Sequence, residues 1–520
     1  MDKKHTGSYY TPDYLAGFIS KRVLSCFEGR QRISILEPSV GDGSFIAELD
    51  KSNLAINVTA IDINEKELKF AKSKWNGNKS TFICSDFLKY NTEKKYNAII
   101  GNPPYVRKSL LKEEQIEIAK RIHEEEGLSE VSVKNIWTTF LIKANKLLTS
   151  TGILAFVLPS ELLQVKFAEE IREYLKNQFQ RIEIFTFNDL MFECKGQDTI
   201  VLFAFKKHSQ KGEYFTNIIS KDVLENENFE LNNNDLLVES KVKWTHHFLS
   251  NDEITSLNRL KESLLKVDDY CESKPGIVTA ANKFFIIDRQ IEEKYNLSNY
   301  TKPIIQKGYY VNGSVEFNKD DFTYLESRYP SRLLQLNNND IIDDDVEKYL
   351  KTGIEQDIPE RYKCKKRNNW YVIPNIANVP EAFFFKRSHH YPKILKNNTN
   401  ALVTDSAYKV NIRDGFDLNS LIFSFYNSLT LAFSEIDGRY YGGGVLELTP
   451  NEFKNLPVPY LSISNHEFVE FVNRFKIKKD INEVLHINDN LILKTVLSLS
   501  SSEITQIQNI RQKLISKRMR

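Results

Sequence analysis

The chain has 520 residues, of which 12% are aromatic and 27% charged, and its formal net charge is +2. This length allows two or three domains with separate cores, and the composition excludes a largely disordered protein. The five cysteines show no paired spacing, which excludes a predicted zinc site or disulfide framework and favours reduced thiols in a cytosol. No segment resembles a signal peptide or approaches the roughly 18 apolar residues of a membrane helix, so we expect a cytoplasmic protein without membrane contact.

The first predicted element is an amphipathic helix over residues 13–24, which follows Tyr10-Thr11-Pro12. Thr11 suits the N-cap and Pro12 the first helical position. A plain helix start is the simplest interpretation, and a ligand-binding role for Thr11 stays open at this point.

A buried strand is predicted from Ile33, followed by a glycine-containing turn and a helix that reaches Leu49. The turn has the sequence Glu37-Pro38-Ser39-Val40-Gly41-Asp42-Gly43. In the dinucleotide fingerprint a third glycine would stand at the position of Ile46, so pyrophosphate binding is disfavoured. A nucleoside without phosphates, such as S-adenosylmethionine, is compatible with this turn.

Two further predicted strands end in carboxylates. Asp62 closes the strand of residues 58–63, roughly 20 residues beyond the glycines, where α/β folds hold ribose hydroxyls. Asp86-Phe87 follows the strand of residues 81–85 and would accept from an adenine amine and cover its face. A single Asp is more often a helix cap or a solvated loop residue, but three successive strands ending in such groups favour a cofactor site.

The fourth predicted strand, residues 98–100, leads into Asn102-Pro103-Pro104-Tyr105. Ligands of open α/β sheets bind at the carboxyl ends of the strands. The prolines lack N–H donors, so the Asn102 and Pro103 carbonyls are expected to point outward as acceptors, and Tyr105 offers a flat face. The segment therefore fits a planar base with an exocyclic amine.

Three more strands are predicted at residues 153–158, 182–187 and 199–205, after a helix around Trp137 that Thr151-Gly152 ends. The last connection is too short for a crossover helix, so the last pair should be antiparallel. The predicted fold is α/β, with a seven-stranded, mostly parallel, Rossmann-like sheet and an antiparallel last strand.

In this order the motifs resemble those of the gamma-class amino-methyltransferases that act on DNA, typified by the TaqI adenine methyltransferase of restriction-modification systems. The resemblance covers residues 1–205 and implies an S-adenosylmethionine-dependent methyltransferase sheet. The cofactor-binding residues that it implies are Thr11, Glu37, Ser39, Gly41, Gly43, Asp62, Ile63, Asp86, Phe87 and Asn102. The catalytic residues that it implies are Asn102, Pro103, Tyr105 and Phe192.

Phe192 lies in the loop of residues 191–197, where that family carries an aromatic that stacks on the extruded adenine. The alternative is an ordinary core phenylalanine. Because charged Glu193 and Lys195 flank it, burial is less easy and the stacking role is favoured.

The carboxyl-terminal half resembles the target-recognition domain of the same family. Its matching stretches are residues 274–287, 302–308, 392–395, 441–448 and 456–459. Basic residues alternate with aromatics over residues 361–371 and 385–390, which favours DNA contact over a merely solvated face. We expect three parts: a methyltransferase domain (residues 1–240), a mixed α+β target-recognition domain (241–460) and a helical extension (461–520). Within the first part, a polar linker is expected from residue 206. The basic end of the extension is either a solvated helix or a phosphate contact.

The predicted reaction is methyl transfer to the N6 amine of an adenine flipped out of double-stranded DNA at a short sequence. No metal is expected, because His389-His390 lacks further ligands at suitable spacing. The alternatives are cytosine-N4 methylation, a non-catalytic DNA-binding specificity protein, and a protein or RNA methyltransferase. Expected partners are double-stranded DNA and a cognate restriction endonuclease on a separate chain, in a prokaryotic cytoplasm at the nucleoid.

Overall fold

The computed structural model describes residues 10–519 except 31, 78, 188–198, 234–242, 312, 339, 341, 375, 377 and 442. Its contacts divide the chain into two compact units. The first runs to Ile254 and includes the short segment Tyr441–Gly443, and the second comprises Thr255–Tyr440 and Gly444–Met519. Within these described ranges no helix is both long and apolar enough to cross a membrane.

The first unit contains one nine-stranded sheet with the order β3-β2-β1-β4-β5-β7-β6-β8-β9. Strands β1 to β5 pair in parallel, and β7 is antiparallel to both of its neighbours. The strands are β1 (Ile33–Glu37), β2 (Ile56–Asp62), β3 (Lys79–Cys84), β4 (Tyr96–Gly101), β5 (Leu148–Pro159), β6 (Arg181–Phe187), β7 (Thr199–Phe205), β8 (Gly212–Ile218) and β9 (Asn232–Asn233). The central strands are almost wholly buried, which explains their apolar sequences.

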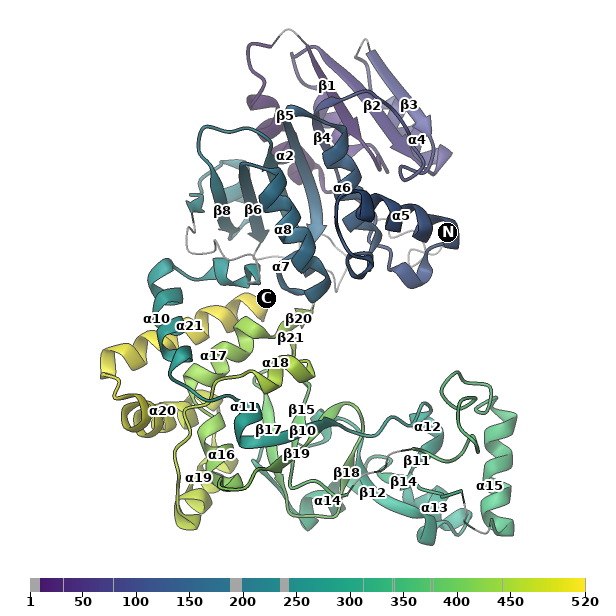
Figure 1. The fold of residues 1–520 in the computed structure, drawn as a ribbon, viewed down its shortest axis with the longest axis vertical. Helices are drawn as coiled ribbons and strands as arrows, with labels where there is room; N and C mark the ends of the chain where they lie inside the picture. The colour runs from purple at the N-terminus through teal and green to yellow at the C-terminus, as the bar shows by residue number, and fades with distance from the viewer. Residues whose placement is uncertain are drawn as a thin grey trace. The chain divides into compact units, whose positions relative to one another are not determined.

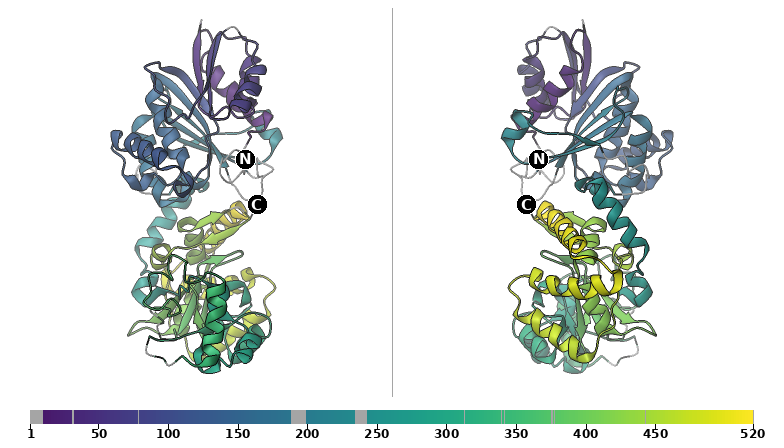
Figure 2. Two further views of the ribbon diagram at one scale, coloured as in Figure 1. Left: turned by 90° about the vertical axis from the view of Figure 1, so that its right-hand side faces the viewer. Right: turned by 90° about the vertical axis from the view of Figure 1, so that its left-hand side faces the viewer.

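Helices cover both faces of this sheet (Figures 1 and 2). One face packs against α2 (Asp13–Ser25), α3 (Ser44–Asp50) and α4 (Glu65–Ser73). The other face packs against α5 (Glu113–Glu125), α6 (Ile136–Leu147) and α8 (Glu169–Gln178). The short helices α7 (Glu161–Gln164) and α9 (Lys221–Glu225) complete the unit. Because helices cover both faces, the ends of the strands are where such a sheet binds ligands.

The prediction of a large mixed α/β sheet is confirmed, but the count of seven strands is wrong. Strands β8 and β9 lie within residues 206–241, which the sequence predicted to be a polar linker. Strand β8 was missed because it mixes polar and apolar residues, although Phe215 and Ile218 are buried where it pairs with β6. The prediction that the last pair is antiparallel is confirmed, because β7 pairs antiparallel with β6, and β7 lies between β5 and β6 in the sheet.

Two predicted boundaries also differ. Helix α2 begins at Asp13 with Pro12 at the cap position, and the Thr11 side chain is not its cap. Helix α6 ends at Leu147 and β5 begins directly at Leu148, ahead of the glycine predicted to stop the helix. Gly152 therefore lies inside the long strand β5.

The second unit has three small sheets. Their strand orders are β10-β19-β15-β17-β13, β11-β14-β12-β18 and β16-β21-β20. The strands are β10 (Cys271–Pro275), β11 (Ile286–Ile287), β12 (Thr301–Ile305), β13 (Glu316–Phe317), β14 (Arg332–Leu334), β15 (Ala382–Phe385), β16 (Arg387–Ser388), β17 (Lys393–Asn397), β18 (Leu402–Val403), β19 (Ala407–Ile412), β20 (Arg439–Tyr441) and β21 (Val445–Glu447). Its helices are α11 (Val267–Tyr270), α12 (Asn282–Phe285), α13 (Arg289–Lys294), α14 (Lys319–Glu326), α15 (Asp344–Glu355), α16 (Leu418–Phe425), α17 (Ser428–Asp437), α18 (Pro450–Lys454), α19 (Asn465–Ile477), α20 (Ile481–Leu497) and α21 (Ser501–Arg518), and α10 (Asn251–Glu262) spans the unit boundary.

The last three helices belong to the core of the second unit, where α21 packs on α17. Arg518 is 4% exposed and forms an ion pair with Glu435, and Arg511 is 3% exposed and donates to Asn482 Oδ1 at 2.6 Å. These two arginines therefore stabilise the helices internally, and the prediction of a solvated or phosphate-binding end is wrong for them. Polar sequence at the end of a chain did not indicate that such long side chains would be buried.

Candidate functional site at the carboxyl edge of the sheet

Three predicted motifs meet where β1 and β4 end. The Asn102 amide nitrogen donates to Thr11 Oγ1 at 3.3 Å, and the Ser39 hydroxyl donates to the Asn102 carbonyl at 3.0 Å. The segment before α2 and the loops after β1 and β4 thus form one constellation. The expectation that the Asn102 main-chain carbonyl points outward is wrong, because Ser39 binds it. The Asn102 side chain is held instead through its amide nitrogen, which donates to Thr11.

The glycine loop is held tightly between β1 and α3. Gly43 has φ +76°, and a Cβ there would lie 2.8 Å from the backbone of Ala71 on α4. Only glycine fits this close approach. Gly41 also has positive φ, and its N–H donates to Asp62 Oδ2 at 2.9 Å.

Two carboxyl groups at this edge have raised pKa values, the buried Glu37 and the partly buried Asp62. Glu37 is 1% exposed, and burial, with the nearby Asp42 and Asp62 charges, raises its pKa well above the ordinary value. Within the described residues Glu37 Oε2 has no hydrogen-bond partner. Burial also raises the pKa of Asp62, although the N–H groups of Asn64 and Gly41 donate to it. The site therefore favours a ligand that brings positive charge and hydrogen-bond donors.

Asp86 follows β3 and lies at the same edge. Its Oδ1 accepts from the Leu88 N–H at 2.9 Å and its Oδ2 from the Gln115 amide at 2.8 Å. The Phe87 ring is 2% exposed and packs on Phe140, so the expectation that this ring covers a base is wrong. Its apolar neighbours on α6 bury it, which the strand pattern did not indicate.

Ile63 is 69% exposed after β2, where it is accessible to a ligand. Tyr10 was not among the predicted residues. Its hydroxyl donates to Glu67 Oε1 at 3.0 Å, and its ring lies against Gly41. With Thr11, Glu37 and Asn102 it lines a small pocket over the loop. The sequence signal that could have identified Tyr10 was its position directly before Thr11-Pro12.

Tyr105 is 9% exposed and packs among the core residues behind the sheet edge. Pro103 lies at the same edge, directly after Asn102. Phe192 lies outside the described residues. The stacking roles of Tyr105 and Phe192 therefore remain predictions.

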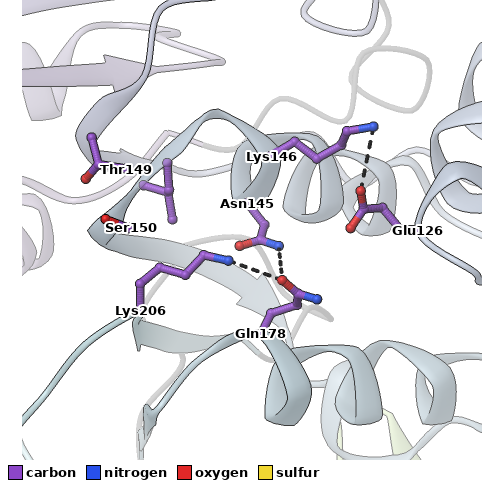
Figure 3. Close-up of a pocket in the computed structure, with 8 residues that line it drawn as sticks. Glu126, Asn145, Lys146, Thr149, Ser150, Gln178 and Lys206 are labelled. Atoms are coloured by element: carbon purple, nitrogen blue, oxygen red, sulfur yellow. Dashed lines mark hydrogen bonds and ion pairs between the residues drawn. The ribbon is translucent and has the colours of Figure 1, made fainter.

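A larger crevice, of about 540 Å³, lies at the opposite edge, where β5 begins (Figure 3). Gln178 Oε1 accepts from the Asn145 amide and the Lys206 ammonium, each at 3.2 Å. Lys146 forms ion pairs with Glu125 and Glu126. None of the predicted motif residues lines this crevice, so the larger hollow and the predicted chemistry lie at opposite ends of the strands.

In the second unit the predicted basic stretches are partly structural. Arg361 donates to the Ala280 carbonyl at 3.2 Å and Arg367 to the Thr279 carbonyl at 2.8 Å. The exposed basic and aromatic members are Arg361, Tyr362, Lys363, Lys365, Lys366, Arg387, His389 and His390. Across the ranges the structure describes, no group of three or more His, Cys, Asp and Glu side chains is placed to hold a metal ion.

Two family profiles match the chain. The profile of the Eco57I restriction-modification methylase matches residues 12–192, and that of the type II methyltransferase M.Eco57I C-terminal domain matches residues 241–493. Type II methyltransferase M.AccI of Acinetobacter calcoaceticus is 22% identical over 476 residues, with 86% of this chain and 84% of the relative covered. M.HincII of Haemophilus influenzae is 28% identical, but the match covers 51% of this chain and 49% of the relative.

Over most of its length the chain is similar to the Eco57I-like methyltransferases of type II restriction-modification systems. A similar fold occurs in a cryo-electron microscopy structure of a DrdV–DNA complex, with a TM-score of 0.51, 12% identity, and coverage of 94% of this chain and 57% of that chain. The cofactor of this Eco57I-like chain is S-adenosylmethionine. The buried Glu37 oxygen without a described partner fits the cationic part of that molecule.

Proposed function

We propose that the chain transfers a methyl group from S-adenosylmethionine to the N6 amine of an adenine in a short DNA sequence, as the gamma-class, TaqI-like enzymes do. The observation that carries the proposal is the meeting of Thr11, Ser39 and Asn102 beside the carboxyl groups of the buried Glu37 and the partly buried Asp62. This arrangement joins a cation-binding loop to an amide that can orient an exocyclic amine.

The cofactor residues would divide as the sequence predicts. Glu37, Thr11, Ser39, Gly41 and Gly43 would hold the methionine end, Asp62 would accept from the ribose hydroxyls, and Asp86 with the exposed Ile63 would hold the adenine. Phe87 contributes through its backbone alone, because its ring is buried. The bound cofactor supplies an electrophilic methyl group on its sulfonium.

The target amine would be oriented by the Asn102 side-chain oxygen and the Pro103 carbonyl. As both oxygens accept hydrogen bonds from its N–H groups, the nitrogen lone pair loses conjugation with the ring and turns towards the methyl carbon. Positioning and charge complementarity then account for the rate. Tyr105 and Phe192 would cover the two faces of the extruded base.

We assign target recognition to residues 241–460, with exposed Tyr362, Lys363, Lys365 and Lys366 as candidate DNA contacts. Residues 1–240 would carry methyl transfer. The compact units divide at Ile254, and the helices of residues 461–520 belong to the second unit, so they would support the recognition domain. A separate restriction endonuclease as partner and a place at the nucleoid complete the proposal.

The test is methyl transfer from labelled S-adenosylmethionine to unmethylated plasmid DNA, followed by digestion and mass spectrometry of the nucleosides. N6-methyladenine is the expected product. N4-methylcytosine would replace the adenine assignment, because that base offers the same kind of amine. Absence of any modified base, with cofactor binding intact, would point to a DNA-binding protein without turnover or to an RNA or protein substrate.

A further inference from the structure

The Asp86 side chain is fixed from two directions. Its first oxygen accepts from Leu88 N–H within its own turn, and its second from the Gln115 amide, 29 residues further along the chain. Gln115 is itself fixed, because its carbonyl oxygen accepts from the Lys112 N–H at 3.2 Å. An amide held at both ends has little rotamer freedom left, so it holds the carboxylate in one orientation.

Gln115 lies in the first turn of α5, which is itself rigidly placed. The buried His123 of α5 hydrogen-bonds to Ser132 and Thr139, at 2.6 and 3.0 Å. At the start of the connection from Asn102 to α5, the Val106 carbonyl accepts from the Ile136 N–H. The donor to Asp86 thus comes from a helix that follows the Asn102–Tyr105 motif directly and is anchored to the core.

We propose that Gln115 is a positioning residue that orients Asp86 to accept the adenine amine of S-adenosylmethionine. The inference rests on the cofactor role proposed for Asp86. Each carboxylate oxygen has two lone pairs, so Asp86 Oδ2 can take a second donor while Gln115 holds the first. A neutral donor suits this task, because an ammonium in its place would compete with the ligand for the carboxylate charge.

The decisive variant is Gln115→Glu. A glutamate at this position still accepts from the Lys112 N–H and so preserves the start of α5, but it offers Asp86 a like charge instead of a donor. Glu114→Gln is the matched control. It changes the neighbouring residue and removes only an exposed ion pair with Lys89.

The probes are S-adenosylhomocysteine and its analogue without the 6-amino group, titrated calorimetrically into the full chain. For Gln115→Glu we expect about tenfold weaker binding of S-adenosylhomocysteine and less than about twofold weaker binding of the analogue. Glu114→Gln should bind both as the unaltered chain does. The KM for S-adenosylmethionine should rise by about tenfold, with kcat within about twofold.

Equal weakening of both ligands, or no weakening, would overturn the positioning role of Gln115. If the unaltered chain binds the two ligands equally well, the adenine-binding role of Asp86 fails, and the inference fails with it. If the unaltered chain binds neither ligand, the proposed function itself fails. Measurements on the variants alone would not reveal this failure.

Discussion

The two edges of the first unit's sheet are formed by the same strands but differ in charge and in pairing. At the carboxyl edge, burial raises the pKa of both Glu37 and Asp62, and one Glu37 oxygen lacks a partner among the described residues. At the amino edge, the polar groups bind one another, as Lys206 and Asn145 do through Gln178. The carboxyl edge therefore holds carboxyl groups whose burial is electrostatically costly. At the amino edge the charged groups pair with neighbours, although Asn145 Oδ1 and Thr149 Oγ1 have no partner among the described residues.

This difference locates the functional site better than size does, since the larger crevice is at the amino edge. Burying a carboxyl group without a partner opposes folding. Buried carboxyl groups of this kind occur mainly where a ligand or a reaction uses them, and residues with perturbed pKa values cluster at functional sites. The predictions below test this contrast by altering similar residues at different places in the unit.

The largest effect is expected for Asn102→Ala. Losing the group that orients the amine should lower kcat by about 100- to 1000-fold, with a smaller change in cofactor affinity. The matched control is Asn97→Ala at the amino end of the same strand, where Asn97 accepts from the Ser34 N–H at 2.9 Å. That change should leave kcat within about twofold and cost about 1 kcal/mol in the free energy of unfolding. Similar losses of kcat in both variants would contradict the assignment.

Asp62→Asn should weaken S-adenosylmethionine binding by about 10- to 100-fold, because hydrogen bonds to a charged acceptor are stronger than those to a neutral one. Calorimetric titration measures this. Asp50→Asn is the control, since Asp50 also accepts from two backbone N–H groups, those of Asn76 and Gly77, but lies away from the edge. Equal weakening in the two variants would mean that Asp62 only supports its loop.

Because the pKa of Glu37 is raised, we expect the affinity for S-adenosylmethionine to depend on the protonation of this carboxyl group. The unliganded Glu37 carboxyl keeps its proton to a higher pH than an ordinary carboxyl does, and a cationic ligand favours the charged carboxylate. Below the raised pKa, binding of S-adenosylmethionine should therefore release a proton and tighten as pH rises. Calorimetry in buffers of different ionisation enthalpy measures this release. Glu37→Gln should remove most of it.

The same group affects folding. Between its ordinary pKa and its raised folded-state pKa, the folded state keeps a proton that the unfolded state loses, so stability should fall as pH rises across this window. Denaturant unfolding of the unliganded Glu37→Gln variant should show a weaker pH dependence there. If the pH dependence of stability and the proton release on binding are unchanged in Glu37→Gln, Glu37 is not the group responsible for them.

The smallest effect is expected at the amino edge. In Lys206→Met, Gln178 keeps its bond from Asn145, and the half-buried amine, whose pKa burial lowers, is replaced by an apolar side chain. Methylation rate and cofactor affinity should stay within about twofold, and the free energy of unfolding within about 1 kcal/mol. A tenfold loss of activity would show that the crevice takes part in function.

How much the sequence predicted depended on the range of the interactions. The strands that end at Glu37, at Asp62 and directly before Asn102 were predictable because apolar runs and turn residues are local signals. The convergence of these residues also followed from the rule that the carboxyl ends of parallel strands share an edge.

What was missed depends on contacts far apart in the chain. The Phe87 ring is buried by Phe140 on another element, and Gln115 reaches Asp86 across a separate motif. From its place near the end of the chain, Arg518 looks like a solvated residue, but its side chain pairs with Glu435. Strand β8 was missed because its apolar residues are buried where it pairs with β6, and its own sequence pattern does not indicate this burial.

The central claim is that the carboxyl edge methylates adenine in DNA through Asn102. The most direct test is long-read sequencing, calibrated for N6-methyladenine and N4-methylcytosine, of DNA from cells that express the unaltered chain or Asn102→Ala. We predict N6-methyladenine in one short motif with the unaltered chain and none with the variant. A soluble, cofactor-binding protein that leaves no modified base, or a variant that methylates as well as the unaltered chain, would contradict the account.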